Sequence, residues 1–259
     1  MPDATDHLHE NYGHFRPQYA GQADDLSARY MRANILPCVA TAGLPKDARI
    51  LELGPGQGLM LHMLRQQGYS KLEGFDVCHD YAAALTQQGY HMHDATSLEQ
   101  LLGMLADGAY DLLIAVDVFE HIARDQLVTF LLGFRRKLRH GGRIIGQVPN
   151  SSGLFGANTF LADPTHVTPF NEISMQSLLR GCGYEQVAIH DVRLPPSWTN
   201  LLRSLVRQVI FKMCYVMMQV VGATPVKHLS HLILFEAVAP APGKGTNDAS
   251  VLNRNAASL

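Results

Sequence analysis

The sequence predicts one α/β domain built on a mostly parallel, doubly wound sheet. From Pro45 onwards, short apolar runs alternate with amphipathic stretches of helical length. This alternation is typical of strand–helix–strand crossovers that cover both faces of a sheet. The chain has 259 residues, which suffice for one large domain with additions but not for two full domains.

The elements are expected in the following order. A polar arm at residues 1–20 precedes a helix at 24–42, and together they form an N-terminal segment, 1–45. The main domain spans 46–239, and the Gly-, Asn- and Ser-rich tail at 240–259 is expected to be disordered. Seven strands are predicted at 48–53, 71–77, 89–93, 110–118, 143–148, 184–192 and 231–238. Helices are predicted at 58–67, 79–88, 98–105, 124–139 and 173–180, the fourth ended by Gly141-Gly142.

Composition excludes two classes of protein. Hydrophobic residues make up 47% and charged residues 17%, so the chain can bury a sizeable core and is not disordered in bulk. The formal net charge of -2 offers no basic excess for phosphate groups. Nucleic acid is therefore not expected as a partner.

Cysteine usage and the polar N-terminus favour a cytoplasmic location. Cys38, Cys78, Cys182 and Cys214 lie far apart without a CxxC pair, as expected of reduced thiols. The first residues lack the apolar stretch of a secretory signal.

A glycine-rich turn follows the first strand of the main domain. Gly54, Gly56 and Gly58 come directly after the strand and lead into a helix. Glycines at such a turn permit positive φ and let a ligand approach the backbone. Asp76 follows Gly58 by 18 residues, at the end of the next strand, where it could accept hydrogen bonds from ribose hydroxyls. The pattern predicts a nucleoside site.

The spacing of the glycines and an adjacent acid select the kind of nucleoside. The turn reads G-x-G-x-G and not the dinucleotide pattern G-x-G-x-x-G, and Glu52 precedes it. A carboxylate there would repel a pyrophosphate but attract the sulfonium and α-amino group of S-adenosylmethionine. NAD is therefore excluded in favour of S-adenosylmethionine.

From Ala48 to about Val192, and again in the last strand, the chain resembles the class I S-adenosylmethionine-dependent methyltransferases. The segments that carry the resemblance are ELGPGQG at 52–58 and DLLIAVDVFEHI at 111–122. The resemblance implies a Rossmann-like, seven-stranded sheet of order 3-2-1-4-5-7-6 with an antiparallel seventh strand. It also implies cofactor contacts from Glu52, Gly54, Gly56, Gly58, Asp76, Val77, Asp94, Ala95 and Asp117.

Two histidines are candidates for a general base that deprotonates an acceptor hydroxyl. His121 follows the fourth strand, at the start of the next helix; its alternative role is to orient other groups. His166 lies in the long loop after the fifth strand, where Asp163 could orient its ring; its alternative is an ordinary polar loop residue. The loop DPTHVTPFN resembles methyltransferases of bacterial surface-polysaccharide synthesis, which implies O-methylation of a sugar hydroxyl in a glycan or glycolipid precursor.

Two other functions remain open at this point. One is a methyltransferase for a small quinone, lipid or metabolite, and the other is a non-catalytic partner that only binds the cofactor.

A metal site is not expected, because the one tight cluster along the sequence, His91, His93 and Asp94, lacks a fourth ligand. Tyr12, Phe15 and Tyr19 of the arm either close over the cofactor or pack against the core.

A basic, apolar segment is inserted before the last strand, within 197–224. Residues 198–222 place a wide apolar stripe at helical spacing, and Arg203, Arg207 and Lys212 are their only charged members. The apolar runs are too short for a membrane-spanning helix. Three interpretations stand: docking to an anionic membrane surface with Trp198 at headgroup depth, pairing with another copy as a homodimer, or a roof over the acceptor.

Overall fold

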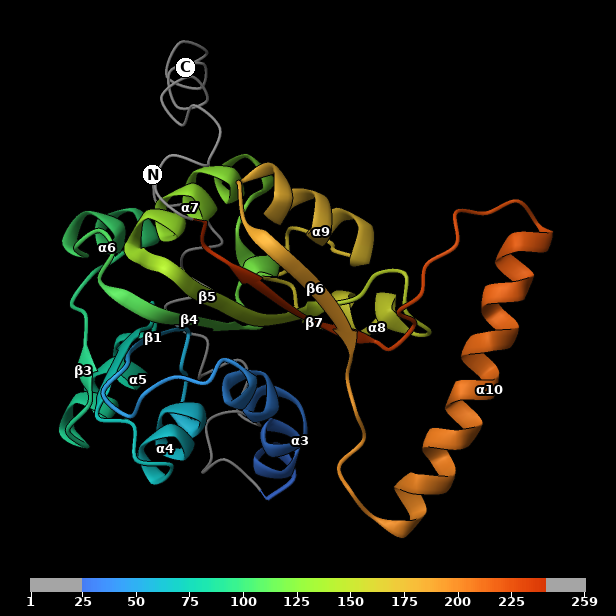
Figure 1. The fold of residues 1–259 in the computed structure, drawn as a ribbon, viewed down its shortest axis with the longest axis horizontal. Helices are drawn as coiled ribbons and strands as arrows, with labels where there is room; N and C mark the ends of the chain where they lie inside the picture. The colour runs from blue at the N-terminus through green and yellow to red at the C-terminus, as the bar shows by residue number, and fades with distance from the viewer. Residues whose placement is uncertain (1–24, 241–259) are drawn as a thin grey trace.

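The computed structural model describes residues 25–240, which form a seven-stranded sheet with helices on both faces (Figure 1). The strands are β1 (Arg49–Leu53), β2 (Lys71–Phe75), β3 (His91–Met92), β4 (Tyr110–Val116), β5 (Leu138–Pro149), β6 (Glu185–Asp191) and β7 (Leu232–Val238). The helices are α3 (Asp25–Thr41), α4 (Leu59–Gln66), α5 (His79–Gln87), α6 (Leu98–Met104), α7 (Arg124–Lys137), α8 (Gly156–Leu161), α9 (Glu172–Gly181) and α10 (Trp198–Val220), with a 3-10 turn η2 (Phe119–His121). The arm with Tyr12, Phe15 and Tyr19, and the tail from 241, lie outside the described residues.

The strand order is β3-β2-β1-β4-β5-β7-β6, as the sequence predicted. β1 pairs in parallel with β2 and β4, whereas β7 runs antiparallel to both β5 and β6. The order reverses beside β1, because the chain first builds the sheet outwards to β3 and then returns to add β4. The carboxyl ends of β1 and β4 therefore flank the crevice where open α/β sheets bind ligands.

Two apolar clusters, one on each face of the sheet, hold the helices in place. One cluster packs α6, α7 and α9 against the sheet around Phe119, Phe134 and Phe235. The other packs α3, α4 and α5 around Ile35, Leu61 and Leu85. Figure 1 shows these two sets of helices on opposite sides of the sheet. Continuous apolar runs such as Leu112–Ala115 in β4 are buried on both faces, as a central parallel strand requires.

Three local predictions were wrong. Gly141-Gly142 does not end a helix: α7 ends at Lys137, and β5 already begins at Leu138, which pairs with Tyr110. The glycines lie in an irregular part of β5, where Gly141 has φ +75°. The polar stretch after Pro149 contains a short helix, α8. The sequence did not predict this helix, because its apolar residues are too few to show a helical pattern. His121 lies in η2 and not in α7, since Ala123 is extended and separates the two.

Gly146 provides a test of the packing at the centre of the sheet. A Cβ there would lie 2.3 Å from the Ala115 carbonyl oxygen and 2.3 Å from Phe235 Cζ. Gly146→Ala is expected to lower the free energy of unfolding by about 3 kcal/mol, because neither β4 nor β7 can move away without breaking its ladder. Gly103→Ala in α6 is the matched control, since its Cβ would meet nothing within 4 Å. It should be neutral or stabilise by about 0.5–1 kcal/mol. Urea unfolding measures both, and equal midpoints would contradict this packing.

Candidate cofactor and acceptor site

The glycine turn after β1 adopts the conformation that its sequence predicts. Gly54, Gly56 and Gly58 have φ of +61°, +51° and +77°, a region that other residues rarely enter. Gly58 is the N-cap of α4, and a Cβ there would lie 2.3 Å from Leu85 Cδ2. At Gly56, by contrast, a Cβ would meet nothing within 4 Å. The turn is therefore tightly packed at its helix end and open at its middle, where a ligand can approach.

Asp76 ties the end of β2 to this turn. Its side chain is buried, and its Oδ2 accepts a hydrogen bond from the Gly56 N–H at 2.9 Å while Oδ1 accepts one from Cys78 N–H at 2.8 Å. Each oxygen keeps a second lone pair, so the carboxylate can also accept hydrogen bonds from ribose hydroxyls. Burial raises the pKa of Asp76 to about 6.

Glu52 is a buried acid with an unsatisfied oxygen beside the same turn. Its Oε2 has no hydrogen-bond partner, and burial and the nearby Asp76 charge raise the pKa of Glu52 to about 8. A buried carboxyl group without a partner is costly unless a ligand supplies one. The open glycine turn, Asp76 and Glu52 fit S-adenosylmethionine, whose ammonium and sulfonium groups are cationic.

Asp117 continues this acidic edge at the end of β4. It has φ +53°, an unusual conformation for a residue other than glycine. Both of its carboxylate oxygens accept hydrogen bonds from Gln147 Nε2, at 2.9 and 3.1 Å, and Gln147 Oε1 accepts one from the Tyr30 hydroxyl. Sequence reasoning missed Gln147 and Tyr30. Gln147 is a polar residue in the otherwise apolar run IIGQV, a pattern that could have indicated it.

The remaining predicted cofactor residues follow β2 and β3 at the same edge of the sheet. Val77 is 37% exposed, and Asp94 is exposed after β3. Ala95 is buried, and its N–H donates to the His93 carbonyl oxygen at 3.1 Å. The fold thus brings every predicted cofactor residue to the carboxyl ends of β1, β2, β3 and β4.

A second group of polar residues lies beyond β4, where η2 meets the loop before α9. The Thr165 hydroxyl donates to Asp163 Oδ1 at 2.5 Å, and the Thr165 N–H donates to the same oxygen at 2.9 Å. Nδ1 of His121 lies 2.8 Å from that hydroxyl oxygen. Sequence analysis paired Asp163 with His166, whereas these hydrogen bonds connect Asp163 through Thr165 to His121.

His166 faces His121 across this group. Their ring centroids are 4.7 Å apart, and His166 Nδ1 lies 2.7 Å from the Phe160 carbonyl oxygen. A carbonyl oxygen only accepts, so Nδ1 of His166 carries a proton. The same assignment holds for His121, because the Thr165 hydroxyl already donates to Asp163 and must accept from His121 Nδ1. Nδ1 is therefore the donor nitrogen of both rings.

Glu120, which the sequence analysis did not single out, lies beside the two rings. Its side chain is fully buried, and neither carboxyl oxygen has a hydrogen-bond partner. Its carbonyl oxygen accepts from Val167 N–H at 2.8 Å and Thr168 N–H at 3.0 Å, which fixes η2 against the loop. Burial, together with the charges of Asp117 and Asp163, raises the pKa of Glu120 well above its usual value.

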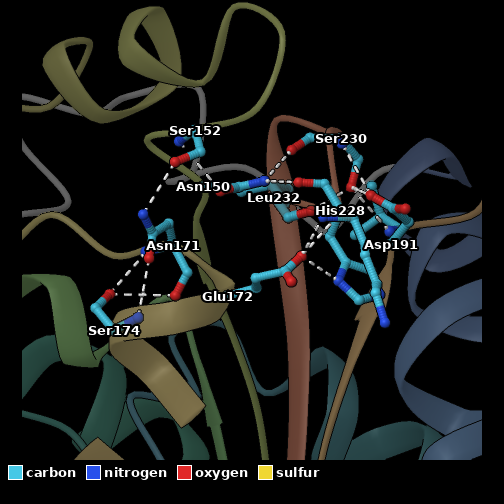
Figure 2. Close-up of polar contacts among 11 residues, drawn as sticks. Asn150, Ser152, Asn171, Glu172, Ser174, Asp191, His228, Ser230 and Leu232 are labelled. Carbon is cyan, nitrogen blue, oxygen red and sulfur yellow. Dashed lines mark hydrogen bonds and ion pairs between the residues drawn. The ribbon is translucent and has the colours of Figure 1, made fainter. Parts of the chain in front are cut away.

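The loop that carries His166 is anchored at both ends (Figure 2). Asn150 Nδ2 donates to the carbonyl oxygens of His228 and Ser230, at 2.9 Å each. At the other end, the Asn171 side chain caps α9 by accepting a hydrogen bond from the Ser174 N–H. Its Nδ2 also donates to the Ser152 hydroxyl at 3.0 Å. The loop is therefore fixed to the start of β7 as well as to η2, which holds His166 in place relative to His121.

The cluster of histidines that the sequence singled out has a different environment. Glu73 accepts hydrogen bonds from His93 Nε2 at 2.8 Å, from the Tyr110 hydroxyl at 2.7 Å and from Arg49. These bonds hold the pKa of Glu73 at about 2, against the effect of burial. The carboxylate is thus fully engaged within the fold. Proximity along the sequence indicated one cluster of potential metal ligands, around His91 and His93. The fold assembles another such group from Glu120, His121 and His166.

Comparisons with known proteins agree with this geometry. A family model described as a methyltransferase domain matches residues 19–189. A methyltransferase structure from Archaeoglobus fulgidus, described as S-adenosylmethionine-dependent, is 19% identical, with 88% of this chain and 99% of that chain covered and a TM-score of 0.65. Phosphoethanolamine N-methyltransferase 2 of Haemonchus contortus, solved with S-adenosyl-L-methionine, is 14% identical, with 90% and 60% covered and a TM-score of 0.57.

A third structure brings a protein partner into the comparison. A putative methyltransferase of Haloferax volcanii, solved with the activator Trm112, is 14% identical, with 90% of this chain and 97% of that chain covered and a TM-score of 0.63. No curated protein matches the chain significantly. At these identities the solved structures support the fold, and the matched family model identifies the family.

Proposed function

Since the chain belongs to the methyltransferase-domain family and S-adenosylmethionine is its cofactor, we propose that it methylates a sugar hydroxyl of a bacterial glycan or glycolipid precursor. When bound, the cofactor supplies an electrophilic methyl group on a positively charged sulfur. Asp76 would hold the ribose hydroxyls, and Glu52 and Asp117 would face the cationic methionine end. Asp117 follows β4 and lies just before η2 in the chain, so the acceptor oxygen would lie next to the two histidines.

The observation that supports a hydroxyl acceptor is the pair of histidines, His121 and His166, whose ring centroids lie 4.7 Å apart beyond the end of β4. A sugar hydroxyl has a pKa far above 7, so it needs help to lose its proton as its oxygen attacks the methyl carbon. The two imidazoles provide that help, and the proton passes on to water. The carbon–sulfur bond breaks with its electron pair left on sulfur. Asp163 acts as a positioning residue, because it holds Thr165 and, through it, the His121 ring.

The acceptor class is tested by offering labelled cofactor to the purified protein with three sets of acceptors. These are lipid-linked and free sugars, quinone precursors, and primary amines. Label transferred to a sugar oxygen is expected. Label on quinone precursors alone would show that the acceptor is a small aromatic molecule and not a sugar. Cofactor binding without transfer to any acceptor, including a cell extract, would instead favour a non-catalytic partner.

The location of the enzyme is suggested by α10, which stands apart from the sheet in Figure 1. None of its residues is buried. Its least exposed side includes Arg207, whose Nη1 donates to the Val192 carbonyl oxygen at 2.8 Å. The other side carries an exposed apolar stripe at helical spacing, made of Leu202, Val206, Val209, Met213, Met217 and Val220. No helix within residues 25–240 has the length and apolar character to cross a membrane.

We propose that this stripe docks on an anionic membrane surface at the cytoplasmic face. The charged residues of α10 are all basic, and two of them, Arg203 and Lys212, are exposed and complement anionic headgroups. Trp198, 88% exposed at one end of the helix, suits the interface between headgroups and acyl chains. A lipid-linked acceptor would then be presented where the enzyme sits.

The protein is expected to sediment with vesicles that contain anionic lipid and less with neutral ones. Replacing Val209 by Asn and Met213 by Gln should weaken partitioning about a hundredfold, since each removes an apolar side chain that lipid would bury. Cys214→Ser is the matched control, because Cys214 lies on the less exposed side. A protein that ignores vesicles but forms dimers, which the same double variant abolishes, would show that a second copy covers the stripe.

A further inference from the structure

We propose that Glu120, His121 and His166 bind a divalent transition-metal ion at the acceptor end of the site. One ligand atom from each residue lies within 4.8 Å of the other two. Glu120 and His121 are adjacent in η2, and the loop before α9 brings His166 beside them (this group is called the Glu120 cluster below). The inference goes beyond the proposed function, because it assigns an inorganic ion to residues that neither the family match nor the fold requires to bind one.

The first argument is that the cluster presents electron pairs from three sides. Phe160 O fixes the proton of His166 on Nδ1, and the Thr165 hydroxyl does so for His121. Nε2 is then the nitrogen of each ring that would bind an ion. His166 Nε2 lies 3.9 Å from Glu120 Oε1, too far for a hydrogen bond. An ion with bonds of about 2.1 Å separates its tetrahedral ligands by about 3.4 Å, so a small side-chain rotation closes the site.

The second argument is the state of Glu120. Its side chain is fully buried, and neither of its carboxyl oxygens has a partner. A native fold rarely leaves such a group unsatisfied unless a ligand completes it. A cation would satisfy the orphaned oxygens.

The third argument is the support behind each ligand. In metal sites, the second ring nitrogen of a ligating histidine is held by a carbonyl or a carboxylate, which orients the ring. His166 has the Phe160 carbonyl in this position, and His121 has Thr165, itself bonded to Asp163. Glu73, His91 and His93 form the contrasting case. Their carboxylate is already bonded to Arg49, His93 and Tyr110, so it has less to offer an ion.

The ligand set selects the class of ion. Two imidazole nitrogens and one carboxylate favour zinc, manganese, iron or cobalt over magnesium and calcium, which prefer oxygen ligands. Three protein ligands leave coordination positions open. An acceptor hydroxyl that occupied one of them would lose its proton to water more readily. This last consequence rests on the proposed function, but the binding of the ion does not.

The test uses the full chain without an affinity tag, stripped with a chelator and titrated with Co²⁺. The wild type should bind one equivalent and develop visible absorption bands. Glu120→Gln and His166→Ala should each weaken binding at least tenfold. Thr165→Val should weaken it less. His91→Ala, which removes a histidine from the Glu73 group, should leave Co²⁺ binding unchanged. Circular dichroism establishes that every variant is folded.

Three outcomes would overturn the inference. The first is no Co²⁺ binding by the wild type, and the second is equal binding by folded Glu120→Gln protein. The third is a loss in His91→Ala as large as that in His166→Ala. The catalytic consequence is tested separately: methyl transfer at full rate in excess chelator would refute it. Co²⁺ binding as described, with no hydroxyl methylated by the loaded protein, would refute the proposed function and leave the metal site intact.

Discussion

His166→Ala is expected to lower the rate of methyl transfer about 10²–10⁴-fold and to leave the affinity for S-adenosylhomocysteine unchanged. The variant removes one of the two Nε2 atoms beside the acceptor, whether that atom acts directly or as a metal ligand. The cofactor contacts at the glycine turn and Asp76 lie on other strands and remain in place. Single-turnover transfer of labelled methyl measures the rate, and calorimetry measures the affinity.

Two further variants make this prediction specific. Thr165→Val should lower kcat more than it raises KM, because it releases the His121 ring without removing it. His140→Ala is the control, since His140 is an exposed histidine in β5, the strand that follows α7, whereas η2 precedes α7. If His166→Ala retained half of the wild-type rate, the assignment of the acceptor site to these histidines would be wrong.

Asp76→Asn is expected to weaken cofactor binding about a hundredfold. The amide cannot accept from ribose hydroxyls as strongly as a carboxylate, and each charge-assisted hydrogen bond contributes about 1.5–3 kcal/mol. Because burial raises the pKa of Asp76 to about 6, the acid is largely ionised at neutral pH. Affinity of the wild type should therefore fall as the pH drops through that value.

The pH profile separates this role from simple loss of structure. Asp76→Asn should bind weakly and with a smaller break near pH 6, because only Asp117, whose pKa burial also raises to about 6, still titrates there. Asp80→Asn, an exposed acid in the first turn of α5, is the matched control and should keep both the affinity and the break. A break of the same size in the Asp76→Asn profile would assign the titration to another group.

The cofactor half of the site could be predicted from sequence because its determinants are local. The turn between β1 and α4 needs positive φ at Gly54, Gly56 and Gly58, and only glycine adopts it readily. Alternating apolar strands and helices then predict where the neighbouring strand and its acid must lie. The order of all seven strands followed from the resemblance and is confirmed.

The acceptor half was only partly predictable, because it is assembled from distant segments. Glu120 and His166 meet only since Val167 and Thr168 donate to the Glu120 carbonyl oxygen, a backbone contact without a sequence pattern. The role of Thr165 between Asp163 and His121 likewise depends on the loop conformation. No periodicity or spacing could have indicated that the Glu120 side chain is left without partners.

The inserted helix shows a similar division. Its apolar spacing and basic charge predicted an amphipathic helix, and α10 is confirmed over Trp198–Val220. Its amphipathic pattern does not specify which side faces the sheet. The structure turns the apolar stripe outward, unlike the stripe of a helix that covers a core.

The central claim is that the crevice between β1 and β4 binds adenosine linked to a sulfur-containing amino acid. Isothermal titration with S-adenosylhomocysteine and with NADH tests it most directly. We expect saturable binding of one equivalent of S-adenosylhomocysteine, weakened in Asp76→Asn, and no heat with NADH. Saturable NADH binding with no response to the thioether would contradict the account.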